Sequence, residues 1–462
     1  MTLRARLISL FRVLTLSVAT GACGAIQLGS RPASSAPAPR EDRPAPGPAR
    51  IDPVAYYRQR GLLAHGAPLP FTGSLGFAAS RTADSSHLIV ALALHADALT
   101  FRREGDMFRA DYRVSVRLRR DAEVVALADA TEPVRVATLR ETSRAEESVV
   151  FQQVLTVPPG AYALSVEVRD MASGRSGAHS LAVQVPSYSS FVLSAPMPVY
   201  ESMPRRTRAE LPRIVMNPRG SGLVNRDSTV DIYVEAYNPG VRQIGFALRV
   251  DTTTIWSDTT AASTESDLAA ALARVPVHLM ALGSGDVLVW EPAGHDTLRT
   301  PVFLGFGDDL PMTTYADMVN YLEYFTNARR LESVRAAAPT ARAAVWRDLM
   351  RATDPVPGSA ENEALRTYFA RMRQANLAYG EPGADGWRTD RGMVLLVLGE
   401  PDQVLDQFTA DATLRGRVQH WEYRAAGLTV VFEDAMGLNR WRLTRSSEAL
   451  VAAARERRHR ES

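Results

Sequence analysis

The amino-acid sequence predicts a multidomain protein of the β plus α+β class, with two immunoglobulin-like β-sandwich domains followed by a domain of helices and a small antiparallel sheet. Between residues 51 and 307, short runs alternate apolar and polar residues, as half-buried strands do. After residue 314 the apolar spacing changes to that of helices. The chain has 462 residues, of which 46% are hydrophobic, so it can supply cores for about three domains.

The first 23 residues have the pattern of a secretory signal peptide. A charged start is followed by a short apolar run, 13–19, and then by small residues. The run is too short to span a bilayer, which takes roughly 20 apolar residues. Cys23 is the only cysteine of the chain, and an exported thiol without a disulfide partner is reactive unless it is modified.

The segment Thr20, Gly21, Ala22 and Cys23 resembles the lipobox of bacterial lipoproteins, although Thr20 stands where that pattern prefers leucine. The resemblance implies that Cys23 becomes the mature N-terminus and carries acyl chains, which anchor the protein in membrane lipid. An ordinary signal peptide with a chance thiol is the alternative. Gly24 is not the aspartate that retains some lipoproteins at the inner membrane. The resemblance therefore favours the outer membrane.

Residues 24–50 have the composition of a tether. Prolines recur between residues 31 and 50, interleaved with alanine and serine. This composition favours an extended polyproline II chain that rises about 3.1 Å per residue. We therefore expect 1–23 to be the signal peptide and 24–50 to hold the body of the protein away from its anchor.

The two β-sandwich domains are predicted at residues 51–190 and 191–307. In the first, apolar and charged residues alternate over 112–118, and 88–94 is a nearly continuous apolar run. In the second, short alternating runs are separated by turn residues, and 263–273 is expected to be a short helix.

Residues 308–462 are predicted to form the third domain. Helical spacing occurs over 315–325, 341–350 and, most clearly, 359–379, where Ser359 is expected to cap the helix. Three antiparallel strands are predicted near the end of the chain, from the alternation of Trp421, Tyr423, Val430, Phe432, Trp441 and Leu443.

A motif lies between these helices and strands. Its residues are Gly386, Trp387, Arg388, Thr389, Asp390, Arg391 and Gly392, followed by Gly399, Glu400, Pro401 and Asp402. The apolar run 393–398 between the two groups reads as a buried strand. These residues resemble the GWxTD domain family in identity and order, over about residues 310–450. The resemblance implies an exported bacterial protein with β domains ahead of the GWxTD domain, and the family has no established activity.

The residue types of the motif favour a structural role over a binding role. Thr389 and Asp390 can accept backbone N–H bonds in a turn, and Gly392 tolerates a positive φ. Trp387 offers a large apolar surface. Asp402 can cap a following short helix.

Few residues are candidates for catalysis or metal binding. A glycosidase pair needs two carboxylates about 5–10 Å apart, and the candidates are Asp390, Glu400, Asp402, Glu433 and Asp434. The eight histidines show no metal-binding spacing, and the chain has no lysine for Schiff-base chemistry or a phosphate loop. The net charge of +2 does not predict a nucleic-acid partner. We expect no cofactor and no metal.

These observations lead us to expect a non-enzymatic envelope lipoprotein that binds protein partners, in assembly or secretion. One alternative is a hydrolase that acts on envelope glycans or peptides through Asp390 and Glu400. Another alternative is small-ligand binding in an apolar pocket between the sheets of a sandwich domain. The sequence leaves the partner and the oligomeric state open.

Overall fold

The structure is a computed structural model. It describes residues 52–461, apart from 143–147, 190–192, 225, 238–239, 265–267, 293–296, 307–311, 360–361 and 409–415. The predicted signal peptide, Cys23 and the predicted tether lie outside the described residues. In the described part of the chain, no helix combines the length and apolar character needed to cross a membrane.

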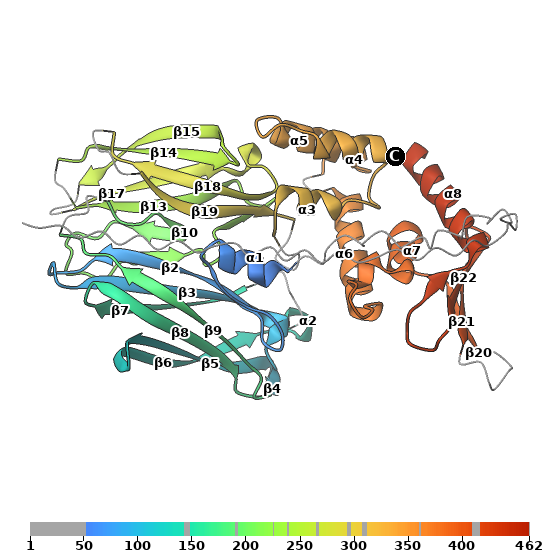
Figure 1. Cartoon of the computed structure of the whole chain (residues 1–462), viewed down its shortest axis with the longest axis horizontal. Helices are drawn as coiled ribbons and strands as arrows, with labels where there is room; N and C mark the ends of the chain where they lie inside the picture. Colours follow the sequence, from blue (N-terminus) through green and yellow to red (C-terminus); the bar gives the residue numbers. More distant parts are fainter. Residues whose placement is uncertain are drawn as a thin grey trace, which may run out of the picture. The chain divides into compact units, whose positions relative to one another are not determined.

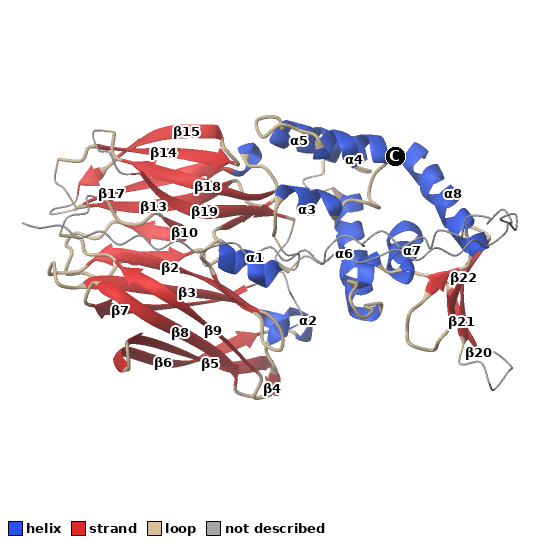
Figure 2. Ribbon diagram, in the orientation of Figure 1, coloured by secondary structure: helices blue, strands red, loops and turns tan. Residues whose placement is uncertain are grey.

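The N-terminal part is an all-β region of several sheets, and a helical plus β region follows it (Figures 1 and 2). The first elements are α1 (Pro53–Gln59), β1 (Leu63–His65), β2 (Phe71–Ala79), β3 (Ser86–His95), β4 (Arg102–Glu104), β5 (Met107–Arg120), β6 (Glu123–Val136), α2 (Leu139–Thr142), β7 (Ser148–Val157), β8 (Gly160–Asp170) and β9 (Ser176–Val185). We call β1 to β9 the first β region.

Two antiparallel sheets of the first β region share one core. One has the order β1-β2-β3-β7, and the other has the order β4-β5-β8-β9 with β6 also paired to β5. The alternation predicted for 112–118 is confirmed, because Tyr112, Val114, Val116 and Leu118 are buried in β5. They pack with Leu88 and other residues of β3, so the burial of one face of each sheet forms the core.

The second β region follows, and it also contains two sheets, β11-β10-β13-β17-β16 and β12-β19-β18-β14-β15. Its strands are β10 (Met197–Met203), β11 (Arg213–Met216), β12 (Ser221–Leu223), β13 (Thr229–Ala236), β14 (Gln243–Val250), β15 (Thr253–Ala261), β16 (Ser263–Thr264), β17 (Ala269–Pro276), β18 (Gly283–Trp290) and β19 (Thr297–Gly305). All strand pairs are antiparallel except β12 with β19, which is parallel.

The short helix predicted at 263–273 is wrong, because the described residues of this segment, apart from Leu268, belong to β16 and β17. The alanines of β17 suggested a helix, but both faces of the strand are buried. Ala269, Ala271 and Ala273 lie in the core of the second β region. Ala270 packs against the first β region. A strand buried on both faces loses its alternating pattern, and small side chains then resemble helix formers.

The two β regions pack against each other through the outer faces of two sheets. Ile89 and Ala91 of β3 contact Met197, Tyr233 and Ala270 of the second β region. The neighbouring residues of β3 point into the core of the first β region. This burial of both faces explains why 88–94 is almost continuously apolar.

A buried ion pair also joins the two β regions. The Arg205 guanidinium donates to both carboxylate oxygens of Glu235 on β13, at 2.8 and 2.7 Å. It also donates to the carbonyl oxygens of Ala79 on β2 and Glu210, each at 2.6 Å. The hydroxyl of Tyr237 donates to Glu235 at 2.8 Å. Both charged side chains have no exposed surface, and several of their hydrogen-bonding groups are satisfied across the junction.

Helix α1 contacts the second β region although it directly precedes β1. The Tyr57 ring packs edge-on against Phe303 of β19, and its hydroxyl accepts a bond from the Met312 amide at 2.9 Å. Arg60, which follows α1, forms an ion pair with Asp286 of β18 at 2.7 Å. The start of the described chain is therefore fixed on the second β region.

The C-terminal part contains six helices with bounds in the described residues, and a four-stranded sheet of order β20-β21-β22-β23. The elements are α3 (Tyr315–Asn320), α4 (Ala328–Arg335), α5 (Arg342–Thr353), α6 (Glu363–Ala378), α7 (Asp390–Leu398), β20 (Gln403–Phe408), β21 (Arg417–Tyr423), β22 (Leu428–Asp434), β23 (Arg442–Leu443) and α8 (Arg445–Glu461). The antiparallel strands predicted near the end of the chain are confirmed as β21, β22 and β23, with β20 as a fourth strand.

Three details of this part differ from the prediction. The run 393–398 is the helix α7 and not a strand; most of its residues are buried, so no polar face marked its helical period. Asn362 caps α6 by accepting the Leu365 amide at 2.9 Å, in place of Ser359. Strand β20 follows Asp402 directly, where a short helix was predicted.

Candidate functional site

The motif residues form a short 3-10 turn, Gly386–Arg388, and the first turn of α7. Thr389 is the N-cap of α7: its hydroxyl accepts the Gly392 amide at 3.2 Å and donates to the Gly386 carbonyl at 2.8 Å. Asp390 accepts the Leu443 amide of β23 at 2.7 Å. Both polar side chains therefore bind backbone, which starts the helix and attaches the sheet to it.

Two glycines of the motif allow three backbone segments to approach closely. A Cβ atom on Gly386 would lie 1.9 Å from the Ala375 carbonyl oxygen of α6. A Cβ atom on Gly392 would lie 1.9 Å from the Gly386 carbonyl oxygen. Gly392 lies within α7 and does not use the positive φ that a glycine tolerates. Close packing, and not an unusual backbone angle, requires glycine at this position.

Trp387 fills the space between the turn and two helices. It is only 1% exposed, and the edges of the Tyr321 and Tyr324 rings face it with ring centres 5.9 and 6.1 Å away. Its backbone amide donates to the Asn376 side chain of α6 at 3.1 Å. Burial of an indole ring is among the largest single apolar contributions to a core, so Trp387 holds the turn in place.

Arg391 is buried between two aromatic rings. Its guanidinium carbon lies 4.9 Å from the ring centre of Tyr379 and 5.0 Å from that of Trp441. Arg417 of β21 also lies over the Trp441 ring, at 5.0 Å. These four side chains form a stack of alternating rings and guanidinium groups, which we call the Arg391 stack. Burial lowers the pKa of Arg391, although this residue remains protonated at any physiological pH.

Two buried carboxylates border the Arg391 stack. Glu381 accepts the Trp441 amide at 3.0 Å and pairs with Arg442 at 3.0 Å. Asp434 pairs with Arg417 at 2.6 Å. Burial alone would raise the pKa of Asp434, but the bonds from Arg417 and from nearby backbone amides hold it below its usual range. The charges around the stack are therefore paired within the domain.

The second motif group, 399–402, forms the turn between α7 and β20. Gly399 has a φ of 88°, which favours glycine, and its carbonyl accepts the Tyr423 hydroxyl at 3.0 Å. Asp402 accepts the Arg424 amide at 2.6 Å. Glu400 is exposed and accepts a bond from Gln374 at 2.7 Å. Pro401 is half-buried in this turn.

The carboxylates proposed for hydrolysis do not face each other. Asp390 begins α7 and Glu400 lies beyond its end, so about ten residues at ~1.5 Å each separate them by roughly 15 Å. Glu433 is exposed on β22, whereas Asp434 is buried and paired. The separation of Asp390 and Glu400 exceeds the spacing of a glycosidase pair. The described residues contain no group of His, Cys, Asp and Glu side chains that could hold a metal ion.

Packed side chains occupy the space between the sheets in the described part of both β regions. Between the sheets of the first β region, the packed side chains include Leu88, Val114 and Leu164, all fully buried. Between those of the second, they include Ile232 and Phe246, also fully buried.

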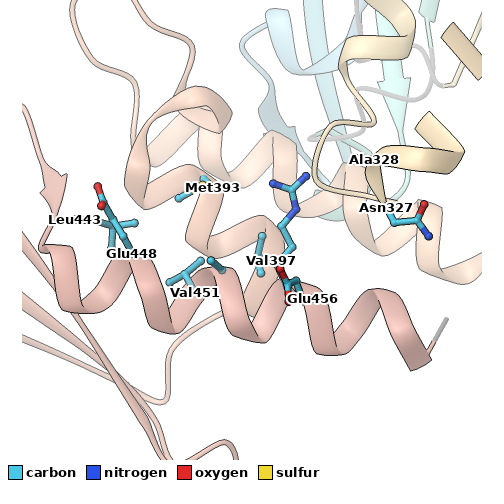
Figure 3. Close-up of a pocket in the computed structure, with 10 residues that line it drawn as sticks. Asn327, Ala328, Met393, Val397, Leu443, Glu448, Val451 and Glu456 are labelled. Atoms are coloured by element: carbon cyan, nitrogen blue, oxygen red, sulfur yellow. The ribbon is translucent and has the colours of Figure 1, made fainter. Parts of the chain in front are cut away.

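An open groove lies beside the motif, between α7, α8 and the start of α4 (Figure 3). Its volume is about 700 Å³. Apolar side chains form its floor: Met393 and Val397 of α7, Leu443 of β23, and Val451 of α8. Glu448, Ala452 and Glu456 of α8 line it as well and are exposed. We call this feature the α7–α8 groove. The groove directly adjoins the motif helix α7.

Sequence reasoning placed the motif but missed the side chains around it. Arg391 was identified only as part of the motif, and its aromatic partners lie 12 and 50 residues away. Nothing in the sequence around Asn376 predicts that its side chain accepts the Trp387 amide. The groove was also missed, because no helix was predicted after Leu443. The run 448–454, which is rich in alanine and contains no glycine or proline, was the available signal for a helix.

Comparison with protein families matches residues 298–448 to the GWxTD domain. Comparison with curated proteins finds no match. Among solved structures, fibronectin(III)-like modules of Clostridium thermocellum CbhA align with 52% of this chain and 93% of their own length, at 12% identity and a TM-score of 0.12. That score is too low to support an inference. The family match contains the motif, the Arg391 stack and most of the groove, and residues 298–448 of this chain are a GWxTD domain.

Proposed function

We propose that the protein is a non-enzymatic lipoprotein of the bacterial envelope, anchored in the outer membrane by acylated Cys23, whose GWxTD domain binds a protein partner. In this proposal the two β regions are immunoglobulin-like sandwiches that present the GWxTD domain at a distance from the membrane. The partner takes part in envelope assembly or secretion.

The α7–α8 groove is the observation that carries this proposal. The Thr389 and Asp390 side chains bind backbone atoms, so they build a rigid support for α7 beside the groove. The groove is open and its floor is apolar. An open apolar surface of this kind on a folded domain is typical of protein interaction sites.

Site-specific photo-crosslinking in intact cells tests the partner. A photoreactive phenylalanine analogue replaces Ala452, which lines the groove, or Ala453, which is exposed on the same helix outside it. We expect Ala452 to yield a reproducible adduct with one envelope protein and Ala453 to yield none. Equal adduct patterns at the two positions would contradict a partner in the groove.

Replacement of Cys23 by Ser tests the anchor separately. Without the thiol no acyl chain can be attached, so we expect loss of metabolic fatty-acid labelling and release of the protein from membranes. Unchanged labelling and membrane retention would overturn lipid anchoring through Cys23.

A further inference from the structure

We infer that Arg391 binds a carboxylate at the surface of the GWxTD domain. The ligand is a planar group with one negative charge, from a small organic acid or from the end of a peptide chain. This site lies in the Arg391 stack and does not depend on a partner in the α7–α8 groove. The inference follows from the hydrogen bonds that Arg391 lacks, from the charges around it, and from the shape of the stack.

The three buried arginines of the described residues differ in their hydrogen bonds. Arg205 donates to a carboxylate and to backbone carbonyl oxygens. Arg219 donates to the Thr72 hydroxyl at 3.1 Å. Arg391 is only 7% exposed, yet its guanidinium donates to no acceptor among the described residues. An unsatisfied charged donor in a buried position is costly, so a bound acceptor would stabilise Arg391.

The donors of Arg391 differ in how far they are shielded from solvent. Its Nε is fully buried and has no acceptor. The Tyr379 and Trp441 rings lie over the guanidinium, with their centres 4.9 and 5.0 Å from its carbon. Arg391 keeps a small exposed area, and its two terminal nitrogens, unlike Nε, are not among the fully buried atoms without a partner. A ligand can therefore approach these two nitrogens end-on.

The charges around the stack leave one positive charge without a counterion. Asp434 pairs with Arg417 at 2.6 Å, and Glu381 pairs with Arg442 at 3.0 Å. With Arg391 included, three guanidinium groups are matched by only two carboxylates. A ligand with one negative charge would balance this cluster. A phosphate dianion would exceed the balance and would be repelled more strongly by the two carboxylates.

The shape of the stack favours a carboxylate among the anions of single charge. A carboxylate is planar, and it pairs with a guanidinium through two parallel hydrogen bonds in one plane. The rings of Tyr379 and Trp441 hold the guanidinium plane in place. The edges of aromatic rings carry a partial positive charge, so an anion beside the stack is not repelled by them.

Ligand-observed nuclear magnetic resonance with the complete chain tests this inference. Cys23→Ser removes the attachment point for acyl chains. Saturation transfer to ligand methyl groups is measured for three probes: acetate, N-acetyl-trialanine with a free C-terminal carboxylate, and the same peptide with a C-terminal amide. Hydrogen phosphate is the competing anion, added at constant ionic strength.

We expect saturable binding of acetate and of the peptide with the free carboxylate, and no binding of the amide peptide, which lacks the negative charge. Equal affinity for acetate and for the free peptide would assign the site to small organic acids. Tighter binding of the peptide would assign it to chain ends. Hydrogen phosphate should bind at least about fivefold more weakly than acetate, because of its second charge.

Substitutions locate the binding at Arg391. Arg391→Met removes the donors and keeps much of the side-chain volume, so acetate binding should weaken at least about tenfold. Arg351→Met is the matched control, because that side chain is 80% exposed on α5, and it should bind acetate as wild type does. Glu381→Gln removes one negative charge and keeps an acceptor for the Trp441 amide, so acetate binding should tighten. This variant provides the test if Arg391→Met does not fold.

Four results would overturn the inference: no saturable binding of acetate, equal binding of the amide peptide and the free peptide, hydrogen phosphate binding as tightly as acetate, or unchanged acetate binding by folded Arg391→Met. Glu381→Gln that binds acetate no more tightly than wild type would also contradict it. The crosslink from Ala452 in cells reports on the groove alone, so failure of the proposed function and failure of the carboxylate site are distinguishable.

Discussion

Two parts of the molecule each bury an arginine, in different ways. The junction between the two β regions buries Arg205, and the GWxTD domain buries Arg391. Arg205 meets a carboxylate: both oxygens of Glu235 accept its bonds, and side-chain bonds with Glu235 help raise its pKa against the opposing effect of burial. Arg391 meets ring faces, those of Tyr379 and Trp441, and burial lowers its pKa.

The ion pair and the stack should therefore respond differently to the substitution of one residue. A buried ion pair is strongly favoured only when both partners are present, because loss of one leaves an unpaired buried charge. A guanidinium between two rings has no single counterion, so its contribution depends on planar shape and on contact with both rings. The junction should therefore fail sharply when one residue is removed, whereas the stack should weaken gradually.

Removal of the Glu235 carboxylate should have the largest effect. Glu235→Ala leaves Arg205 buried and unpaired, and we expect the free energy of unfolding to fall by about 3–5 kcal/mol, measured by urea denaturation. Combined Arg205→Met and Glu235→Leu should recover most of that loss. Asp231→Asn on the same strand, whose cation Arg274 is exposed and 3.9 Å away, is the control and should change stability by less than about 1 kcal/mol.

Substitution of the motif glycine Gly386 by alanine should have the second-largest effect on stability. The Cβ of Gly386→Ala would overlap the Ala375 carbonyl oxygen, so α6 and the turn must separate. We expect a loss of about 1–3 kcal/mol and a changed near-ultraviolet circular dichroism signal from Trp387. Gly380→Ala, where the nearest atom is 3.7 Å from the added Cβ, should change stability by under about 0.5 kcal/mol. Equal effects of the two substitutions would show that close approach is not the reason for glycine.

Arg391→Lys tests the stack itself. Lysine keeps the charge but cannot present a flat surface to two rings, so we expect a loss of about 1–2 kcal/mol by denaturant unfolding. Arg351→Lys is the control, because that side chain and its partner Asp348 are 80% and 71% exposed and surface ion pairs contribute about 0–1 kcal/mol. A larger loss for the control would contradict the stacking argument.

Lowering the pH should have the smallest effect on stability, and it should affect the junction and the GWxTD domain in different pH ranges. His87 at the junction has a pKa lowered first by burial and then by Arg205, against an opposing influence of Glu235. Its unfolded-state pKa is about 6.5, so the unfolded chain takes up the proton first and stability falls as the pH drops below that value. The pKa of Asp434 is also low in the folded state, so its contribution is lost only below about pH 4.

His87→Gln should remove part of the stability loss between about pH 6.5 and 5, measured as the melting temperature across that range. His179→Gln is the comparison, because burial also lowers the pKa of that more exposed histidine. Asp434→Asn should leave the slope in this range unchanged. A slope that does not differ between wild type and His87→Gln would place the acid response elsewhere.

The sequence predicted the strands well wherever one face meets solvent. The strand β5 alternates because its Arg113, Arg117 and Arg119 side chains face outward, so its period was visible. The helix α7 and the strand β17 were both assigned the wrong element, for one physical reason. Residues buried on all sides show no period, and the neighbours that bury them come from distant parts of the chain.

The motif illustrates the same limit at the site. Thr389 and Asp390 could be predicted to bind backbone, because their side chains do so locally in caps and turns. The atom that Asp390 binds belongs to Leu443, 53 residues away. The groove also depends on how α8 returns beside α7, which no local pattern specifies.

The attachment of α1 has a mechanical consequence. A pull on the chain ahead of residue 52 acts first on α1, which contacts Phe303 and Met312 and is followed by Arg60, the partner of Asp286. Helix α1 also contacts β1 of the first β region. Tension from a membrane anchor would thus be transmitted toward the GWxTD domain through α1 and the second β region. The same pull would reach the first β region through β1, which follows α1 and whose Ala64 carbonyl accepts a bond from Arg58 at 3.0 Å, so the two β regions would share the load.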